Sequence, residues 1–334
     1  MHMADALVTP AIAGTMYVCS AAAAAYSIKK VKEENAPEKI PVMGVMGAFV
    51  FATQMINFTI PGTGSSGHLC GGMMLSALLG PWAGFLTMIG VLLIQCLFFA
   101  DGGLLALGCN VWNMAFYGCF IGGLVIWRLI MQNGASRAKI ILASVLGCVL
   151  TLQLGAFSVT LETLLSGITA LPFGTFAAAM QPIHLAIGLV EGLITAAVLL
   201  FVYEARPELL WGIGGTKKES KMSFGWTLGI LSGAAALIGG GLSLLASSLP
   251  DGLEWAIGRI TGSEELEAAE EGIYAAAQSV QDATSFLPDY AFRGSESALG
   301  TTVSGIVGAL IVVAVMVGAA LLFKFFKGRK KSAA

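Results

Sequence analysis

Long apolar stretches alternate with short polar connections along almost the whole chain. Nine stretches can be delimited, at about residues 7–28, 41–60, 70–80, 82–100, 104–130, 138–163, 181–203, 224–247 and 301–326. Most of them reach the roughly 20 residues that an α-helix needs to cross the hydrocarbon core of a bilayer. The pattern predicts an all-α protein, a polytopic bundle of transmembrane helices with only a modest soluble part.

The third stretch is the exception in length. It runs for about eleven residues from Cys70 to Gly80, and Gly80-Pro81 separates it from the fourth stretch. One interpretation is a half-helix that ends at a break surrounded by protein, because a break inside the membrane is tolerated only there. The alternative is one kinked helix over 70–100.

The distribution of basic residues favours nine separate segments. If the N-terminus lies outside and all nine segments cross, every lysine and arginine except Arg259 and Arg293 falls on the inner side. Merging the third and fourth segments would move two basic groups outward, against the positive-inside rule. We therefore expect the N-terminus outside and the C-terminus inside. Residues 1–28 lack the basic start of a cleaved signal peptide, since they carry Asp5 ahead of the apolar run.

Composition places the chain among membrane proteins and narrows its chemistry. Hydrophobic residues make up 56% and charged residues 11% of the sequence, far from the balance of a soluble domain. The sequence contains no Gly-x-x-x-x-Gly-Lys phosphate loop and no basic nucleic-acid footprint. We expect a multi-pass protein of a prokaryotic cell membrane, not an enzyme, with no organic cofactor and no nucleic-acid partner.

The first two residues and one loop carry candidate metal ligands. The α-amine of Met1, together with the backbone nitrogen and imidazole of His2, can bind one ion through adjacent chelate rings. His68 ends the loop Gly62-Thr63-Gly64-Ser65-Ser66-Gly67-His68, which the expected topology places on the same outer face. Its imidazole could close a planar site of four nitrogens, an arrangement that suits Ni(II) or Cu(II).

Three ionisable residues lie within apolar stretches: Glu162, His184 and Glu191. Charge inside the membrane is expensive, so each is a candidate functional residue. His184 and Glu191 are seven residues apart, which places them on one helix face. They either form a proton or metal relay or are satisfied by neighbouring helices. The relay would make the chain a secondary, proton-coupled carrier of divalent transition metals, which is the alternative function.

Two further segments have either a purely structural or a functional interpretation. The alanine run from Ala21 to Ala25 gives a flat helix surface that could pack inside the bundle or dock a partner helix. The outer segment at about 248–300 carries an acidic run at 264–271, which we expect to be helical. It is either a solvated surface or a field that concentrates cations, and the role of 255–286 is left open.

Four separated motifs follow one another along the chain: Met1-His2-Met3-Ala4-Asp5-Ala6-Leu7, the segment 60–69 around His68, Asp101-Gly102-Gly103 with Asn110 downstream, and the segment 182–195 around His184 and Glu191. Together they resemble the CbiM/NikM family, the substrate-binding membrane subunits of energy-coupling-factor (ECF) transporters for cobalt and nickel. The later sequence resembles the companion NikN-type subunit through Pro250-Asp251-Gly252-Leu253-Glu254. The resemblance divides the chain into a metal-binding domain at 1–210, a cytoplasmic linker at 211–223 and a NikN-like domain at 224–334 with two transmembrane helices.

The resemblance also implies a site and partners. The site would consist of the Met1 amine, the amide and imidazole of His2, and the imidazole of His68, with Asn110 shaping the region of its lid. The substrate would be Ni²⁺ or Co²⁺. The partners would be a transmembrane scaffold subunit and two cytoplasmic ATPases, within the lipid membrane. The sequence thus predicts a subunit that captures the ion outside and releases it inward when ATP is hydrolysed elsewhere in the complex.

Overall fold

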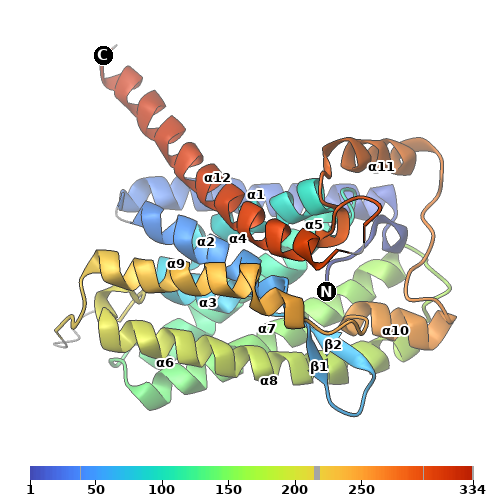
Figure 1. Cartoon of the computed structure of the whole chain (residues 1–334), viewed down its shortest axis with the longest axis horizontal. Coiled ribbons are helices and arrows are strands. Elements are labelled where there is room, and N and C mark those ends of the chain that lie inside the picture. The colour runs from blue at the N-terminus through green and yellow to red at the C-terminus, as the bar shows by residue number, and fades with distance from the viewer. Residues whose placement is uncertain (38, 214–218, 296, 333–334) are drawn as a thin grey trace.

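The computed structural model of the chain describes residues 1–37, 39–213, 219–295 and 297–332, and it shows a bundle of long helices with one small hairpin of strands (Figure 1). The first part of the chain forms α1 (Pro10–Glu34), α2 (Lys39–Gln54), β1 (Phe58–Ile60), β2 (Ser65–Gly67), α3 (Gly72–Leu79), α4 (Pro81–Phe99), α5 (Leu107–Asn110), the π-helical η2 (Val111–Trp127), α6 (Arg128–Met131), α7 (Arg137–Leu165) and α8 (Phe173–Ala205). The later part forms α9 (Phe224–Gly240), α10 (Gly252–Thr261), α11 (Gly272–Thr284) and α12 (Ala298–Ser332). Short 3₁₀ turns lie at Asp5–Leu7, Pro207–Leu209, Leu242–Leu245 and Pro288–Tyr290.

The predicted class, an all-α polytopic membrane protein, is confirmed. Among the described residues, six helical segments are long and apolar enough to cross a membrane: Pro10–Glu34, Pro81–Phe99, Leu107–Met131, Arg137–Leu165, Phe173–Ala205 and Ala298–Ala319. The helices α2 and α9 are apolar but shorter. Each of the nine apolar stretches overlaps one of these helices or α3. The number of crossings and the outward N-terminus stay predictions.

The chain reverses between α3 and α4. Gly80 has a φ of +82°, and Pro81 opens α4. Gly84 of α4 lies against α3, because a Cβ added there would be 3.0 Å from the main chain of Leu75. The two segments therefore form a helical hairpin and not one kinked helix. The eight buried residues of α3 span only about 12 Å, too short to cross a bilayer unaided.

The later helices share one core with the earlier ones. Both α9 and α12 pack against α2. At this contact a Cβ added to Gly47 of α2 would lie 2.9 Å from Val312 of α12. The N-terminus, the β1–β2 hairpin, α10 and α11 gather at one end of the bundle, and α12 leads away from that end (Figure 1). This end contains the candidate site.

The sequence predicted a helix over the acidic run 264–271, and this prediction is wrong. Those residues form an exposed connection between α10 and α11. Helices form on either side of the run, where each sequence has a face to bury: α10 buries Leu253, Ala256 and Ile257, and α11 buries Ala277 and Gln281. The acidic run has no such apolar face, and its like charges repel one another when they lie a helical turn apart.

Close backbone contact between helices explains part of the glycine content. Gly72 of α3 and Gly118 of η2 face each other, and a Cβ added at Gly118 would lie 2.8 Å from the Cα of Gly72. Because main-chain atoms lie on both sides, no flexible side chain can move aside. Small residues at helix crossings let backbones approach in membrane proteins.

We predict that Gly118→Ala destabilises the protein by about 1–3 kcal/mol, because the added methyl group overfills a helix crossing. The measurement is the midpoint of thermal denaturation in detergent. Gly229→Ala is the matched control, since a Cβ added to that α9 glycine meets nothing within 4 Å. Alanine should leave stability unchanged there or raise it by up to about 1 kcal/mol. Equal effects of the two substitutions would contradict the predicted contact.

Candidate metal site

The first residues of the chain enter the bundle. Met1 is 4% exposed and Met3 is fully buried. Asn110 holds this segment at two points: the Met3 amide donates to its Oδ1 at 2.7 Å, and its Nδ2 donates to the Met3 carbonyl at 3.1 Å. Asn110, which the resemblance placed near the lid of the site, thus contacts the main chain two residues after Met1.

Two glycines leave room for the entering segment. Gly102 has a φ of +82°, and a Cβ there would lie 3.1 Å from the Cβ of His2. The amide of Gly103 donates to the Met3 carbonyl at 2.9 Å, and a side chain at Gly103 would overlap the carboxylate of Asp5. The motif Asp101-Gly102-Gly103 is therefore the wall along which residues 2–5 run.

His2 lies between a carboxylate and a second imidazole. Its Nδ1 is 3.0 Å from Oδ1 of Asp101, and its ring stacks on that of His68 with centroids 5.2 Å apart. The hydroxyl of Tyr290 donates to the other oxygen of Asp101 at 2.5 Å. Burial alone would raise the pKa of Asp101, but the adjacent His2 and these hydrogen bonds bring it below its ordinary value.

The β1–β2 hairpin positions His68. The strands pair antiparallel with Thr59 opposite Ser66, and Gly62 and Gly64 supply the positive φ angles of the turn, +77° and +76°. His68 directly follows β2 and is 7% exposed. Because its Nδ1 lies 3.0 Å from the Leu69 carbonyl, which can only accept, Nδ1 carries the proton and Nε2 keeps its lone pair.

A buried carboxylate fixes the main chain just after His68. Glu191 of α8 is 1% exposed. Its two oxygens accept hydrogen bonds from the amides of Cys70 and Gly71, both at 2.8 Å. This pair of bonds ties the loop that carries His68 to a long helix.

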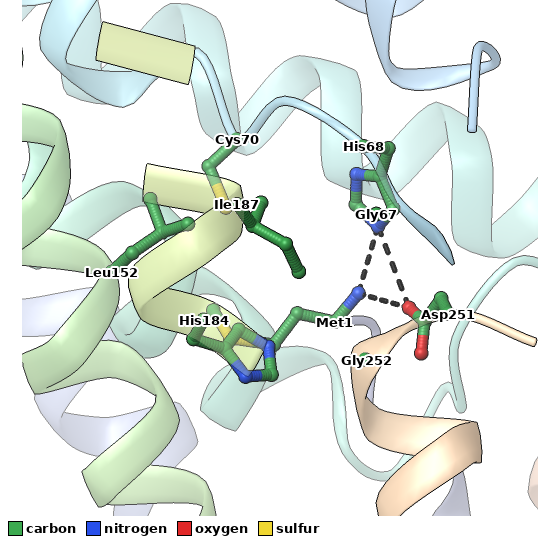
Figure 2. A pocket seen from close by; sticks show the side chains of 9 residues that line it. All are labelled: Met1, Gly67, His68, Cys70, Leu152, His184, Ile187, Asp251 and Gly252. Atoms are coloured by element: carbon green, nitrogen blue, oxygen red, sulfur yellow. Dashed lines mark hydrogen bonds and ion pairs between the residues drawn. The ribbon is translucent and has the colours of Figure 1, made fainter. Parts of the chain in front are cut away.

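The Met1 amine is the centre of the site. It lies 2.7 Å from Nε2 of His68 and 2.5 Å from Oδ2 of Asp251, and the same Asp251 oxygen is 3.6 Å from Nε2 of His68 (Figure 2). The three groups form a small triangle, in which residues from the start, the first third and the last third of the chain meet. A nitrogen pair at this separation can turn both lone pairs to a common ion once the amine has lost its proton.

The charges of this triangle support one another. Burial lowers the pKa of the Met1 amine, but the charge and hydrogen bond of Asp251, together with a smaller contribution from Asp101, leave that pKa above its ordinary value. For Asp251 burial acts upward, yet the positive charge of the adjacent amine brings the pKa of the carboxyl well below its usual range. Burial and the adjacent amine lower the pKa of His68, which favours the neutral imidazole that binds metal ions.

Asp251 is a residue of this site that the sequence did not indicate. The residue is the N-cap of α10: its Oδ1 accepts from the amides of Leu253 and Glu254, at 2.7 and 3.0 Å, and the Glu254 side chain accepts from the Asp251 amide at 2.8 Å. This capping box accounts for the local sequence by itself. Only the tertiary structure shows that the second oxygen, Oδ2, points to Met1.

A small cavity adjoins the triangle. Its empty volume is about 200 Å³ including the solvent at its mouth, and its lining consists of Met1, Gly67, His68, Cys70, Leu152, His184, Ile187, Asp251 and Gly252 (Figure 2). His184 is 1% exposed, and its Nδ1 donates to the Met180 carbonyl at 2.8 Å. Its Nε2 has no hydrogen-bond partner within the described residues.

The three residues proposed as a relay contact different parts of the molecule. Glu162 accepts a hydrogen bond from Asn113 at 2.7 Å, Glu191 holds the loop after His68, and only His184 lines the cavity. In the part of the chain that the structure describes, no hydrogen bond joins any two of them. Both oxygens of Glu191 are satisfied by main-chain amides, whereas Nε2 of His184 and one oxygen of Glu162 have no hydrogen-bond partner among the described residues.

The site differs in kind from a cluster of side-chain ligands. Within residues 1–37, 39–213, 219–295 and 297–332, no group of three or more His, Cys, Asp or Glu side chains could hold a metal ion. The ligand set predicted from the sequence instead draws two of its four nitrogens from the main chain. The alanine surface of α1 lies elsewhere, with Ala21 and Ala25 both exposed.

Two protein families match the chain. Residues 2–209 match CbiM, described as the cobalt uptake substrate-specific transmembrane region, and residues 225–325 match the PDGLE domain. The two ranges lie one after the other and together cover most of the sequence.

Similar proteins carry both regions in one polypeptide. The chain is 35% identical over 321 residues to a putative fused nickel transport protein NikMN of Archaeoglobus fulgidus, covering 94% of this chain and 96% of the relative. It is 30% identical to a probable fused nickel transport protein LarMN of Lactiplantibacillus plantarum, covering 95% and 97%. A crystal structure described as a truncated transition metal transporter matches 61% of this chain and 99% of its own, with a TM-score of 0.54 and 29% identity.

We predict that Glu191→Gln lowers stability by about 1–3 kcal/mol, because the amide nitrogen of glutamine leaves one buried N–H of Cys70 or Gly71 without an acceptor. Thermal denaturation in detergent measures the loss. Glu33→Gln is the control: the exposed Glu33 contacts Lys30 at 2.9 Å within one helix, and such a pair contributes about 0.5 kcal/mol or less. If both variants denature at the same temperature, Glu191 does not anchor the loop.

Proposed function

The chain belongs to the CbiM family of cobalt-uptake substrate-specific transmembrane proteins and carries a PDGLE domain in the same polypeptide, and on this premise we propose that it is the substrate-binding subunit of an ATP-driven ECF-type uptake transporter for Ni²⁺ or Co²⁺. Stated more generally, the chain is a membrane component of nickel or cobalt transport. We assign residues 1–210 to the metal-binding domain, 211–223 to a cytoplasmic linker and 224–334 to the companion domain.

The contact between the Met1 amine and His68 carries the proposal. These two nitrogens lie 2.7 Å apart inside a buried pocket, with the imidazole of His2 stacked on that of His68. We propose that the ion binds the amine, the amide and imidazole of His2, and Nε2 of His68. Because Nδ1 of His2 now contacts Asp101 at 3.0 Å, chelation requires that imidazole to leave Asp101 and turn toward Met1.

The donor set bears on the choice of metal. Four nitrogens in a plane suit Ni(II) well, whereas Co(II) more often takes further ligands, and Cu(II) binds nitrogen donors still more tightly in the general order of affinity. Selection for Ni²⁺ or Co²⁺ must therefore come from the geometry of the pocket and from delivery of the ion. The acids around the outer end of the bundle, among them the exposed run 264–271, would concentrate cations of either kind.

The proposal assigns ATP hydrolysis to other subunits of the complex. The sequence contains no phosphate-binding loop of its own, so ATP hydrolysis belongs to two cytoplasmic ATPases joined through a transmembrane scaffold subunit. The small exposed side chains of Ala21 and Ala25 on α1 give that scaffold a surface for close helix contact. A proton-coupled carrier that uses Glu162, His184 and Glu191 is less well supported, because those side chains are engaged separately.

We predict that one residue placed before Met1 weakens Ni²⁺ and Co²⁺ binding by more than about 100-fold, because loss of a ligand exceeds the 10–100-fold cost of losing an outer-shell partner. The amine moves out of the chelate, while His2 and His68 stay. Isothermal titration of the purified protein measures the affinity, after mass spectrometry has established that the unextended protein has a free amine at Met1. The same residue added at the C-terminus is the control, and equal affinities of the two extended proteins would exclude the amine site.

A transport assay separates the proposal from the proton-coupled carrier. We expect vesicles containing this chain with its scaffold and ATPases to take up ⁶³Ni²⁺ when ATP is supplied. Vesicles containing the chain alone should show no uptake under a pH gradient. The carrier hypothesis predicts the reverse: uptake by the isolated chain, driven by the gradient, and abolished by Glu162→Gln or Glu191→Gln.

A further inference from the structure

A turn of the companion domain docks on the loop that carries His68. Ser66 donates through its amide to the Pro250 carbonyl at 2.8 Å and through its hydroxyl to the Leu249 carbonyl at 2.7 Å. One helical turn further, the indole of Trp255 donates to the Thr63 carbonyl at 3.0 Å. All three bonds have a main-chain carbonyl as acceptor, and their donors are an amide, a short hydroxyl side chain and a rigid indole, so they fix the turn in place without depending on long flexible side chains.

The underside of the same turn closes the cavity. A Cβ added at Gly252 would lie 2.7 Å from Ile183 and 3.1 Å from both His184 and Ile187. Only glycine leaves space for the turn to lie flat on this part of α8. Asp251 and Gly252 of this turn therefore form one wall of the pocket that Met1 and His68 also line (Figure 2).

Asp251 uses its two oxygens for different purposes. Oδ1 caps α10 through the amides of Leu253 and Glu254, and these bonds set the orientation of the carboxylate. Oδ2 is consequently held toward the pocket, at 2.5 Å from the Met1 amine. A helix cap thus places one negative oxygen beside two of the proposed nitrogen ligands before any ion arrives.

We propose that Asp251 of the companion domain is a positioning residue of the metal site, which holds the Met1 amine beside His68 in the metal-free protein and places a negative charge next to the incoming divalent cation. The inference rests on the proposed function for the identity of that cation. The first domain then contributes the nitrogen donors, and the companion domain secures the end of the chain among them.

The free-energy cost of burying an unpaired charge predicts what happens when Asp251 loses its charge. A buried cation that loses its only carboxylate partner is strongly destabilised, because its desolvation is no longer compensated. In most proteins such a charge is trapped by the surrounding chain, but Met1 is a chain end and can withdraw. Removal of the Asp251 charge should therefore expose the amine and remove it from the site, while the hold of Asn110 on Met3 limits the change to the first two residues.

The test compares Asp251→Asn and Asp251→Ser with Asp282→Asn in the full-length protein. Asparagine and serine are both good N-cap residues, so α10 keeps its cap. The control removes another outer carboxylate: Asp282 is exposed and accepts a hydrogen bond from Gln278 at 2.9 Å, a bond that asparagine can also accept. Thermal denaturation of all four proteins shows whether they remain folded.

Two readouts are needed. The first is the rate at which an amine-reactive ester labels Met1 in the metal-free protein. Mass spectrometry measures this rate relative to the labelling of the exposed lysines. We expect both Asp251 variants to react at least about tenfold faster than wild type, since the buried ion pair is lost. The second is the affinity for Ni²⁺, which should fall by about 10–100-fold, as for other residues that orient metal ligands. Asp282→Asn should change neither.

The outcomes separate this inference from the proposed function. Unchanged labelling in the Asp251 variants overturns the positioning role, even if wild type binds Ni²⁺ tightly. Faster labelling with unchanged Ni²⁺ affinity overturns the role in the metal site. If wild type binds neither Ni²⁺ nor Co²⁺ while labelling still depends on Asp251, the proposed function has failed and the hold on the amine stands.

Discussion

The site depends on the burial of a chain end that carries a positive charge. A buried charge is stable only when it is paired and hydrogen-bonded, and Met1 finds both partners, in His68 and Asp251. Other features of this end of the bundle follow from the same need. Asn110 grips the main chain at Met3, and Gly102 leaves space for the segment to pass. Each contact removes conformational freedom from the first residues, so that under the proposed function the main change left for an ion to cause is the turn of the His2 ring away from Asp101.

The sequence was sufficient for the helices and for part of the site. Apolar runs of membrane length locate the long helices because a bilayer leaves few other ways to satisfy the backbone, and Gly80-Pro81 correctly predicts where α3 ends. The sequence was insufficient where tertiary contacts determine whether a helix forms or which residues meet. The acidic run at 264–271 has the composition of a helix but no apolar face to bury. The position of Asp251 was missed for a different reason: the capping box explains that residue completely at the local level, so no signal was left to suggest a second partner far earlier in the chain.

Charge within the spans proved informative about architecture. The rule that intramembrane carboxylates are functional selected Glu191, and the structure places it under the loop of His68, where it accepts two main-chain hydrogen bonds. Its importance is therefore indirect, through the position of an imidazole. Glu162 fits the same description, since it bonds Asn113, three residues along the chain from the asparagine that holds Met3. A carboxylate that organises a loop and one that relays protons look alike in sequence, because both need burial and both need partners.

The arrangement gives a physical reason for carrying both domains in one polypeptide. The triangle needs a nitrogen from Met1, a ring from His68 and a carboxylate from Asp251, and it exists only while the turn at 249–254 is docked. The polar part of that contact consists of one hydrogen bond between main chains, from Ser66 to Pro250, and of side-chain bonds from Ser66 and Trp255 to main-chain carbonyls. Covalent linkage makes docking intramolecular, at an effective concentration that reaches about the millimolar range. A contact of modest size then suffices to hold Asp251 beside Met1 and His68. The packing of α9 and α12 on α2 acts in the same direction, since these two helices fix both ends of the segment that contains the turn.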